Sequence, residues 1–223
     1  MDRCHVREHG SVLAAGEKRL LIAIAARLPS WINSDHLTLL AFAAMLAAGA
    51  SFAALQSWTW SAPAFVAALA VNWFGDSLDG TLARVRDRQR PRYGYYVDHV
   101  LDLAGTSALV AGMAASGSMT PSVAFVALAA YFAVAAESYL AAHTVGVFRI
   151  AFGGVGPTEL RILLAIGAVA VARDPWCDIA GRRLLILDVG GAIAAAGMAG
   201  AFVVSAARNG RALYRAEPLA AER

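Results

Sequence analysis

Four aspartates in this sequence have the type and spacing to do chemistry: Asp76, Asp79, Asp98 and Asp102. The first two are three residues apart and the last two are four apart, so each pair lies on one face of a helix. A short basic loop separates the pairs, which makes the two helices antiparallel neighbours. The sequence therefore predicts that four carboxylates converge on a small volume.

Carboxylates at close range repel one another, most strongly where water is excluded. A divalent cation relieves this repulsion, and ligands that are all oxygen favour Mg²⁺ or Mn²⁺ over zinc. Protein-bound Mg²⁺ usually completes its coordination with water and substrate phosphates, so the ligand type indicates a substrate that carries phosphate.

The residues beside the first aspartate pair fit this interpretation. Gly80 and Ala83 leave space on the helix face that carries Asp76, and Arg84 follows with a planar guanidinium suited to phosphate. The structural alternative is that the aspartates form salt bridges with loop arginines and hold no metal. That alternative gives the small residues no role.

The elements that position these residues are predicted to be membrane helices. Of the 223 residues, 59% are hydrophobic and 16% are charged, against about 25% charged in a soluble domain. No Asp, Glu, Lys or Arg occurs in residues 36–75 or 103–136. The first of these stretches would be about 60 Å long as helix, twice a hydrocarbon core of roughly 30 Å, so it predicts a helical hairpin.

Cys4 and Cys177 are too few and too far apart for a disulfide framework or a thiolate metal site.

The expected fold is all-α and integral to the membrane. Residues 11–28 mix basic and apolar residues at helical spacing and predict an amphipathic helix at the membrane interface. Six transmembrane helices are expected after it, at roughly 36–56, 62–84, 94–115, 121–143, 158–173 and 184–206. The chain is thereby divided into an N-terminal segment, a six-helix domain and a tail, with boundaries 1–30, 31–207 and 208–223.

Orientation follows from the basic residues, because short cytoplasmic loops are enriched in Lys and Arg. One side collects 16 of the 19 basic residues if it holds the N-terminal segment, the loop at 84–92, the connection after residue 143 and the tail. Both termini are therefore expected in the cytoplasm. The basic run at 84–92 is explained equally well by this orientation signal alone or by a contact with lipid headgroups or substrate phosphates.

The aspartate region resembles the signature of the CDP-alcohol phosphotransferases, integral membrane enzymes of phospholipid synthesis. The matching pattern is Asp76-x-x-Asp79-Gly80-x-x-Ala83-Arg84 followed by Gly94-x-x-x-Asp98-x-x-x-Asp102. The spacer before Gly94 is one residue longer than is usual in the family. Asp35-His36-Leu37-Thr38 resembles the family's Asn-x-x-Thr pattern, with Asp in place of Asn. Residues 30–206 are compatible with the family's helix count and topology.

The resemblance implies a cytosol-facing cavity in which carboxylates hold Mg²⁺ on the diphosphate of a CDP-linked alcohol. An acceptor hydroxyl attacks the phosphorus that bears the alcohol, and CMP leaves. Asp76, Asp79 and Asp98 are then the principal metal ligands. Asp102 is the general base or a further ligand, so it is an expected catalytic residue together with Asp98. The residues expected to bind the nucleotide are Asp35, Thr38, Asp79, Gly80, Ala83 and Arg84.

Candidate acceptor-binding residues lie farther along the chain: Glu137, Arg149, Glu159 and Arg161. The uncharged run after Arg161 would be only about 16 Å long as helix, too short to cross the membrane core alone. Glu159 and Arg161 are therefore expected near or inside the membrane boundary. Glu137 is expected to pair with Arg161, either lining the pocket or as a structural bridge. The two arginines could bind the phosphate of an inositol or glycerol phosphate.

Several alternatives remain open at this point. The donor is CDP-diacylglycerol or a CDP-aminoalcohol, because Asp98-His99 resembles the choline and ethanolamine branch of the family. A six-helix cation transporter that uses the aspartates as an ion site is the alternative function, and a non-catalytic scaffold is a third. The expected partners are a CDP-linked donor, a small or lipid alcohol acceptor, membrane lipids and a second copy of the chain, with no nucleic acid. The expected location is a bacterial-type plasma membrane, with the active site facing the cytoplasm.

Overall fold

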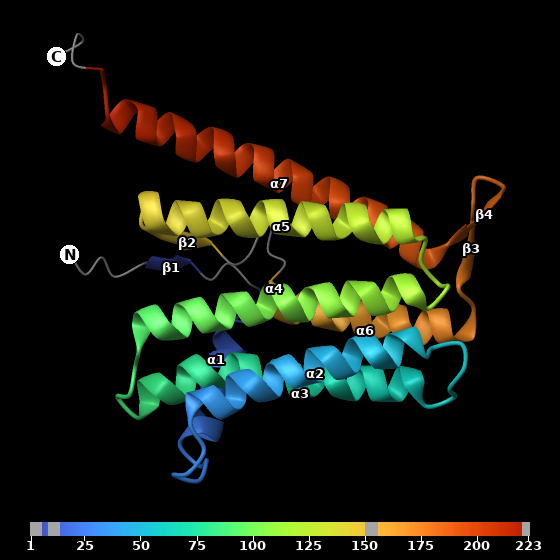
Figure 1. Ribbon diagram of the computed structural model, residues 1–223, viewed down its shortest axis with the longest axis horizontal. Helices are drawn as coiled ribbons and strands as arrows, with labels where there is room; N and C mark the ends of the chain where they lie inside the picture. Colours follow the sequence, from blue (N-terminus) through green and yellow to red (C-terminus); the bar gives the residue numbers. More distant parts are fainter. Residues whose placement is uncertain (1–5, 9–13, 150–155, 220–223) are drawn as a thin grey trace.

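The structure, a computed structural model, describes residues 6–8, 14–149 and 156–219. These residues form seven helices and four short strands (Figure 1). The helices are α1 (Ala14–Ala25), α2 (Ser34–Ala53), α3 (Ser61–Val85), α4 (Pro91–Ala115), α5 (Pro121–Thr144), α6 (Pro157–Arg173) and α7 (Ile186–Ala216). The strands are β1 (Val6–Glu8), β2 (Val147–Arg149), β3 (Trp176–Ile179) and β4 (Arg182–Leu185).

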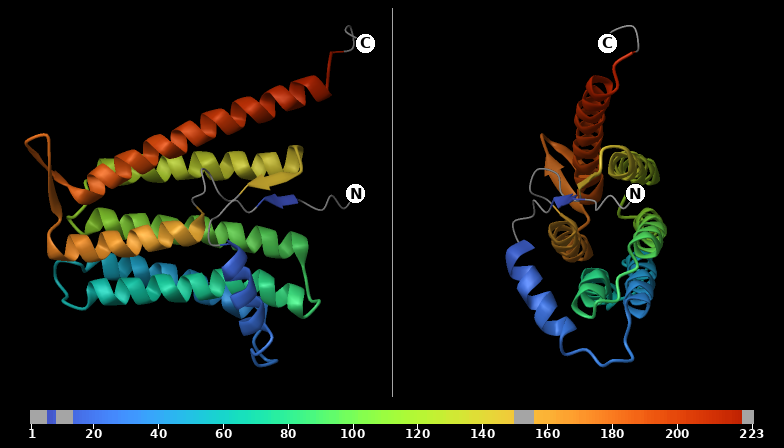
Figure 2. Two further views of the ribbon diagram at one scale, coloured as in Figure 1. Left: turned by 180° about the vertical axis from the view of Figure 1, so that it is seen from behind. Right: turned by 90° about the vertical axis from the view of Figure 1, so that its left-hand side faces the viewer.

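The helices from α2 to α7 run alternately in opposite directions along one bundle (Figures 1 and 2). One end of the bundle carries the α2–α3 and α4–α5 turns and the β3–β4 hairpin. The other end carries residues 86–90, called here the arginine loop, and the C-terminal end of α7, while the shorter α6 begins about midway along the bundle. The parallel pair β1–β2 and helix α1 also lie toward this second end, so elements from both ends of the sequence meet there.

Three of the helices are long and apolar enough to cross a membrane: Ser34–Ala53, Pro121–Thr144 and Ile186–Ala216. They correspond to three of the six spans expected from the sequence. Helices α3 and α4 carry the four aspartates, which lower their hydropathy, and α6 has only 17 residues. The polar residues of the candidate site are thus found on the helices that are less typical of a span.

Helices α2, α3 and α4 pack at unusually short range through small residues. A Cβ atom on Gly112 of α4 would overlap the backbone of Gly49 on α2. A Cβ on Gly75 of α3 would lie 2.5 Å from the carbonyl oxygen of Leu37. A side chain at Gly105 would be 3.0 Å from Met45. The close contacts of Gly105 and Gly112 are therefore made inside one copy of the chain.

Helix α1 is held against α3 by both apolar and polar contacts. Leu21 and Ala25 are buried in a cluster with Leu78 and Leu82 of α3. After the helix, Arg86 donates hydrogen bonds to the carbonyl oxygens of Leu28, Pro29 and Ile32. A helix is present within the expected range 11–28, and its connection to α2 is fixed to the arginine loop.

The region before α7 corrects the expectation of a helix starting at residue 184. Residues 184–185 belong to β4, which pairs with β3 in an antiparallel hairpin. The two hairpin-turn residues, Ala180 and Gly181, have φ angles of 51° and 76°, as a tight two-residue turn requires. Helix α7 then continues to Ala216, ten residues beyond the expected end at 206. The short strands were missed because their basic and apolar residues also fit a helix end.

The packing of α4 on α2 makes a testable prediction about stability. Gly112→Ala should lower the melting temperature of the purified protein, because the added methyl group meets the backbone of Gly49. Overpacking of this kind costs about 1–3 kcal/mol, or roughly 3–10 °C. Gly197→Ala is the matched control, since nothing lies within 4 Å of its Cβ position and alanine favours a helix. Equal melting temperatures for the two variants would contradict the described α2–α4 contact.

Candidate active site

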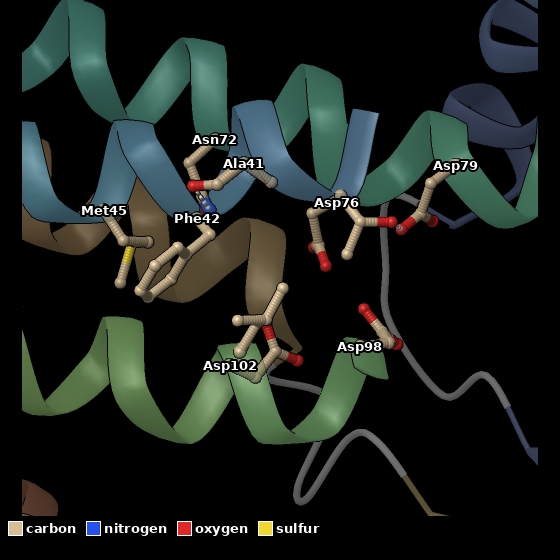
Figure 3. A pocket seen from close by; sticks show the side chains of 10 residues that line it. Ala41, Phe42, Met45, Asn72, Asp76, Asp79, Asp98 and Asp102 are labelled. Atoms are coloured by element: carbon tan, nitrogen blue, oxygen red, sulfur yellow. Dashed lines mark hydrogen bonds between the residues drawn. The ribbon is translucent and has the colours of Figure 1, made fainter. Parts of the chain in front are cut away.

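One cavity between α2, α3 and α4 contains all four aspartates singled out in the sequence. Figure 3 shows the carboxylates of Asp76 and Asp79 on α3 opposite those of Asp98 and Asp102 on α4. The other lining residues of the cavity are Thr38, Ala41, Phe42 and Met45 of α2, Asn72 of α3, and Leu101 of α4.

Helical periodicity explains why these residues meet. The lining residues of each helix are separated by one, three or four positions, so each helix presents one face to the cavity. Helices α3 and α4 are joined by the short arginine loop and run in opposite directions, as the sequence predicts. Helix α2 covers the open side, and its part of the lining is mainly apolar. The carboxylates therefore face one another from two helices beneath a third.

Asp79 is fixed by hydrogen bonds from α2 and from its own helix. The Thr38 hydroxyl donates to Asp79 Oδ2 at 2.7 Å, and the backbone N–H of Gly80 donates to Asp79 Oδ1. The hydroxyl of Ser34 donates to the backbone carbonyl oxygen of Asp79 at 2.8 Å. Two of the expected nucleotide-binding residues, Thr38 and Asp79, are thus in direct contact.

Asp76 forms an ion pair with Arg161 of α6. The distance between Arg161 Nη2 and Asp76 Oδ2 is 2.5 Å, and the two side chains are only 16% and 21% exposed. Arg161 Nε also donates to Asn72 Oδ1 at 2.7 Å, while Asn72 Nδ2 donates to the carbonyl oxygen of Ala41 at 3.0 Å. One guanidinium therefore connects α6 to α3, and through Asn72 to α2.

Asp98 and Asp102 form a small ligand group with the histidine between them. The possible metal-ligating atoms of Asp98, His99 and Asp102 lie within 4.8 Å of one another. The His99 ring is buried and stacks on Tyr139 of α5, with centroids 4.9 Å apart and an interplanar angle of 16°. The Tyr95 ring also contacts the His99 ring, with the two ring centroids 4.2 Å apart. This part of the site offers two carboxylates and an imidazole at a range that suits a metal ion.

A second cavity, larger than the first, lies at the arginine-loop end. Asp35 and Ala83, both expected to bind the nucleotide, line it together with Arg86, Arg88 and Arg90. The Asp35 carboxylate accepts a hydrogen bond from Arg90 and raises the pKa of that guanidinium above its ordinary value. Asp35 and Thr38 are about one turn apart on α2, so this helix borders both cavities.

The arginine contacts bear on the alternative in which loop arginines neutralise the aspartates. Arg90 pairs with Asp35, and Arg86 binds backbone carbonyl oxygens. Arg84 donates to the hydroxyl of Thr81 at 3.0 Å, and its Nη1 lies 3.3 Å from the Cβ position of Gly80. The ion pair described at Asp76 comes instead from Arg161 on α6.

The expected pair between Glu137 and Arg161 is wrong. Glu137 is buried between α5 and α7, where it accepts a hydrogen bond from Asn209 Nδ2 at 2.7 Å. Arg161 is committed to α3, as described above. Sequence reasoning placed Glu137 and Arg161 together as the two charged groups without evident partners, and it had no signal for Asn209 on a helix that was expected to end at 206.

The other two acceptor candidates also have defined positions. Glu159 lies in the first turn of α6, where its carboxylate accepts a hydrogen bond from the backbone N–H of Gly156 at 3.0 Å. It therefore contributes to capping this helix. Arg149 ends strand β2, and its side chain lies outside the described part of the structure.

Sequence analysis missed Asn72 and gave His99 no role in the site. Asn72 is buried one turn before Asp76 on the same face, and a lone amide in an uncharged stretch was its only signal. His99 was noted only as part of a dipeptide. Its contact with Tyr139 depends on α5 packing beside α4, which no local pattern reports.

A comparison with known proteins gives the site its context. The sequence model of the family described as CDP-alcohol phosphatidyltransferase matches residues 31–205. No curated individual protein matches the chain. The matched range includes α2 to α6, most of α7 and all four aspartates of the cavity. Together with the three helices able to cross a membrane, this match shows that the chain belongs to the CDP-alcohol phosphatidyltransferase family of membrane enzymes, which transfer a phosphate-containing group from a CDP-alcohol in lipid synthesis.

Proposed function

We propose that this protein transfers a substituted phosphate group from a CDP-linked alcohol to an acceptor hydroxyl, with Mg²⁺ or Mn²⁺ bound, and releases CMP. The observation that carries the proposal is the cavity in which four carboxylates from α3 and α4 face one another. The family supports the reaction class. The donor is proposed to be CDP-diacylglycerol or a CDP-aminoalcohol.

The residues of the cavity fit a divalent cation. Asp76, Asp79, Asp98 and Asp102 supply oxygen ligands only, which Mg²⁺ and Mn²⁺ prefer, and His99 is close enough to add a nitrogen. Arg161 neutralises part of the negative charge at Asp76. A bound ion would neutralise the rest and the charge of the donor diphosphate.

Asp102 is proposed to act as the general base, with Asp98 beside it. The acceptor hydroxyl gives its proton to Asp102 while its oxygen forms a bond to the phosphorus that bears the alcohol. The bond from that phosphorus to the CMP oxygen breaks, and CMP leaves with the electron pair. Leu101, Phe42 and Met45 help to line the cavity with apolar surface, which limits attack by water.

The nucleotide is proposed to bind along α2 and the end of α3. Thr38 and Asp79 lie at the carboxylate cavity, while Asp35 and Ala83 lie at the larger cavity beside the arginine loop. Gly80 and Arg84 directly follow Asp79 and Ala83 on α3. This placement would let a diphosphate reach the carboxylates while the nucleoside occupies the larger cavity.

The acceptor is proposed to approach from the side of α6. Arg161 already points into the carboxylate cavity, and Glu159 fixes the turn of α6 that precedes it. Arg149 remains a candidate for the acceptor phosphate. The bond between Glu137 and Asn209 supports a structural role in α5–α7 packing for that glutamate.

The membrane arrangement is proposed to be six spans, α2 to α7, with both termini and the arginine-loop end in the cytoplasm of a bacterial-type cell. Residues 1–30, 31–207 and 208–223 would be the N-terminal segment, the catalytic domain and the tail. A homodimer is proposed, with an interface elsewhere than Gly105 and Gly112, whose faces already contact α2. The carboxylates lie in the half of the bundle nearer the arginine loop, which favours an enzyme over a midplane ion transporter.

The central prediction concerns CMP release from the purified protein in detergent or vesicles. Asp98→Asn should lower the rate at least about 100-fold with the preferred donor and acceptor, because it removes a charged oxygen ligand beside the reacting groups. Asp188→Asn is the matched control, since Asp188 binds Thr120 at the opposite end of the bundle. A rate for Asp98→Asn equal to that of the control would exclude the proposed site.

Metal removal should act on the same reaction. Chelation with EDTA is expected to abolish CMP release, and Mg²⁺ or Mn²⁺ should restore it, because the ligand set is rich in carboxylate oxygens. Ca²⁺ serves as the comparison ion, since it tolerates a looser coordination geometry. Full activity after exhaustive chelation would show that the carboxylates do not work through a divalent ion.

The acceptor side can be tested separately with Arg161. Arg161→Ala should raise the acceptor KM by roughly 10-fold or more, as expected when a charged hydrogen bond of about 1.5–3 kcal/mol is lost. The donor KM should change little. Arg182→Ala, in the hairpin at the other end, is the control. An unchanged acceptor KM in Arg161→Ala would remove this residue from the acceptor site.

A further inference from the structure

Helix α1 carries a carboxylate that joins two helices of the candidate active site. Glu17 Oε1 accepts hydrogen bonds from Trp73 Nε1 at 2.7 Å and from the Ser77 hydroxyl at 3.2 Å, both on α3. The Thr158 hydroxyl of α6 lies 3.1 Å from the same oxygen and 3.2 Å from Oε2. One side chain thus receives donors from α3 and α6 at the same point.

These three donors belong to the helical turns of α3 and α6 that carry the Arg161–Asp76 ion pair. On α3, Trp73 precedes Asp76 by three residues and Ser77 directly follows it. On α6, Thr158 precedes Arg161 by three residues, which is nearly one helical turn. Glu17 therefore holds α3 and α6 together next to the place where Arg161 reaches Asp76.

Anchoring of α1 does not by itself require this arrangement. Leu21 and Ala25 already bury the apolar face of α1 on α3, and Arg86 fixes the segment that follows. The hydrogen bond from Thr158 has a different effect, because it links α1 to α6. The apolar cluster described above contains no residue of α6. A carboxylate also makes stronger hydrogen bonds than a neutral acceptor does. Glu17 lies before residue 31, where the family match begins.

We propose that Glu17 is a positioning residue that keeps the first turn of α6 in register with α3, so that Arg161 reaches the carboxylate cavity. The residue does not line that cavity, and it acts through Arg161. This inference rests on the proposed function, including the acceptor role of Arg161. It assigns to α1 a role in the reaction in addition to its expected place at the membrane surface.

A double-mutant cycle on Glu17 and Arg161 tests the proposal. Glu17→Ala is expected to lower kcat/KM for the acceptor by roughly 10-fold, mainly through KM, while the donor KM stays within about twofold. The double variant should then be no worse than Arg161→Ala alone, because both changes remove the same contribution. Glu17→Gln keeps an acceptor oxygen for the three donors and should stay within about threefold of the parent.

Thr158→Val provides a second variant that leaves α1 on α3 and removes only the link to α6. Thr158→Val should raise the acceptor KM as much as is expected for Glu17→Ala. The test therefore stands even if Glu17→Ala folds poorly. Thr144→Val is its matched control, because the Thr144 hydroxyl donates to the carbonyl oxygen of Leu140 on its own helix. Melting temperatures of all variants, compared with the parent, identify loss of fold.

The outcomes separate the two proposals. Losses that multiply in the Glu17→Ala, Arg161→Ala double variant, or a Thr158→Val variant that matches Thr144→Val, would overturn the positioning role alone. Failure of the parent protein to release CMP from any CDP-linked donor would overturn the proposed function, and the inference with it. Non-multiplying losses with recovery in Glu17→Gln would support the role of Glu17.

Discussion

The mutual repulsion of four carboxylates in one cavity is the constraint on which the rest of this structure depends. Two unit charges about 4 Å apart repel by roughly 4 kcal/mol at an effective dielectric constant of about 20. The fold opposes this cost with specific neighbours: Arg161 at Asp76, and the hydroxyl of Thr38 at Asp79. A divalent cation would neutralise the negative charge that remains and could then hold a diphosphate. The source of instability and the proposed source of chemistry are therefore the same group of side chains.

Such a group needs helices that keep a fixed separation. The glycines of α2, α3 and α4 provide it, because their contacts join backbone to backbone and leave no side chain that could rearrange. Gly112 meets Gly49, and Gly75 meets the carbonyl of Leu37. Asn72 adds a polar link between α3 and α2 at the same depth. The small residues thus set the geometry of the cavity without contributing to its chemistry.

Helices α1 and α6 complete the site from outside this three-helix unit. Helix α6 brings the guanidinium that reaches Asp76, and α1 brings Glu17, which contacts both α6 and α3. Helix α1 lies toward the arginine-loop end, and α6 begins about midway along the bundle (Figure 1). Elements distant in sequence are thereby concentrated around one half of the bundle, where the proposed reaction takes place.

The sequence by itself determined most of the helices, the opposite directions of α3 and α4 and the meeting of the four aspartates, because helical period, uncharged length and a short loop are local properties. It also identified the family through residues on those two helices. Only the tertiary structure decided the partners across the bundle. Arg161 and Asp76 are 85 residues apart, and Glu17 and Thr158 are 141 apart. Partners at such separations depend on how α1, α6 and α7 pack, and side-chain packing leaves no periodic signal in a single sequence.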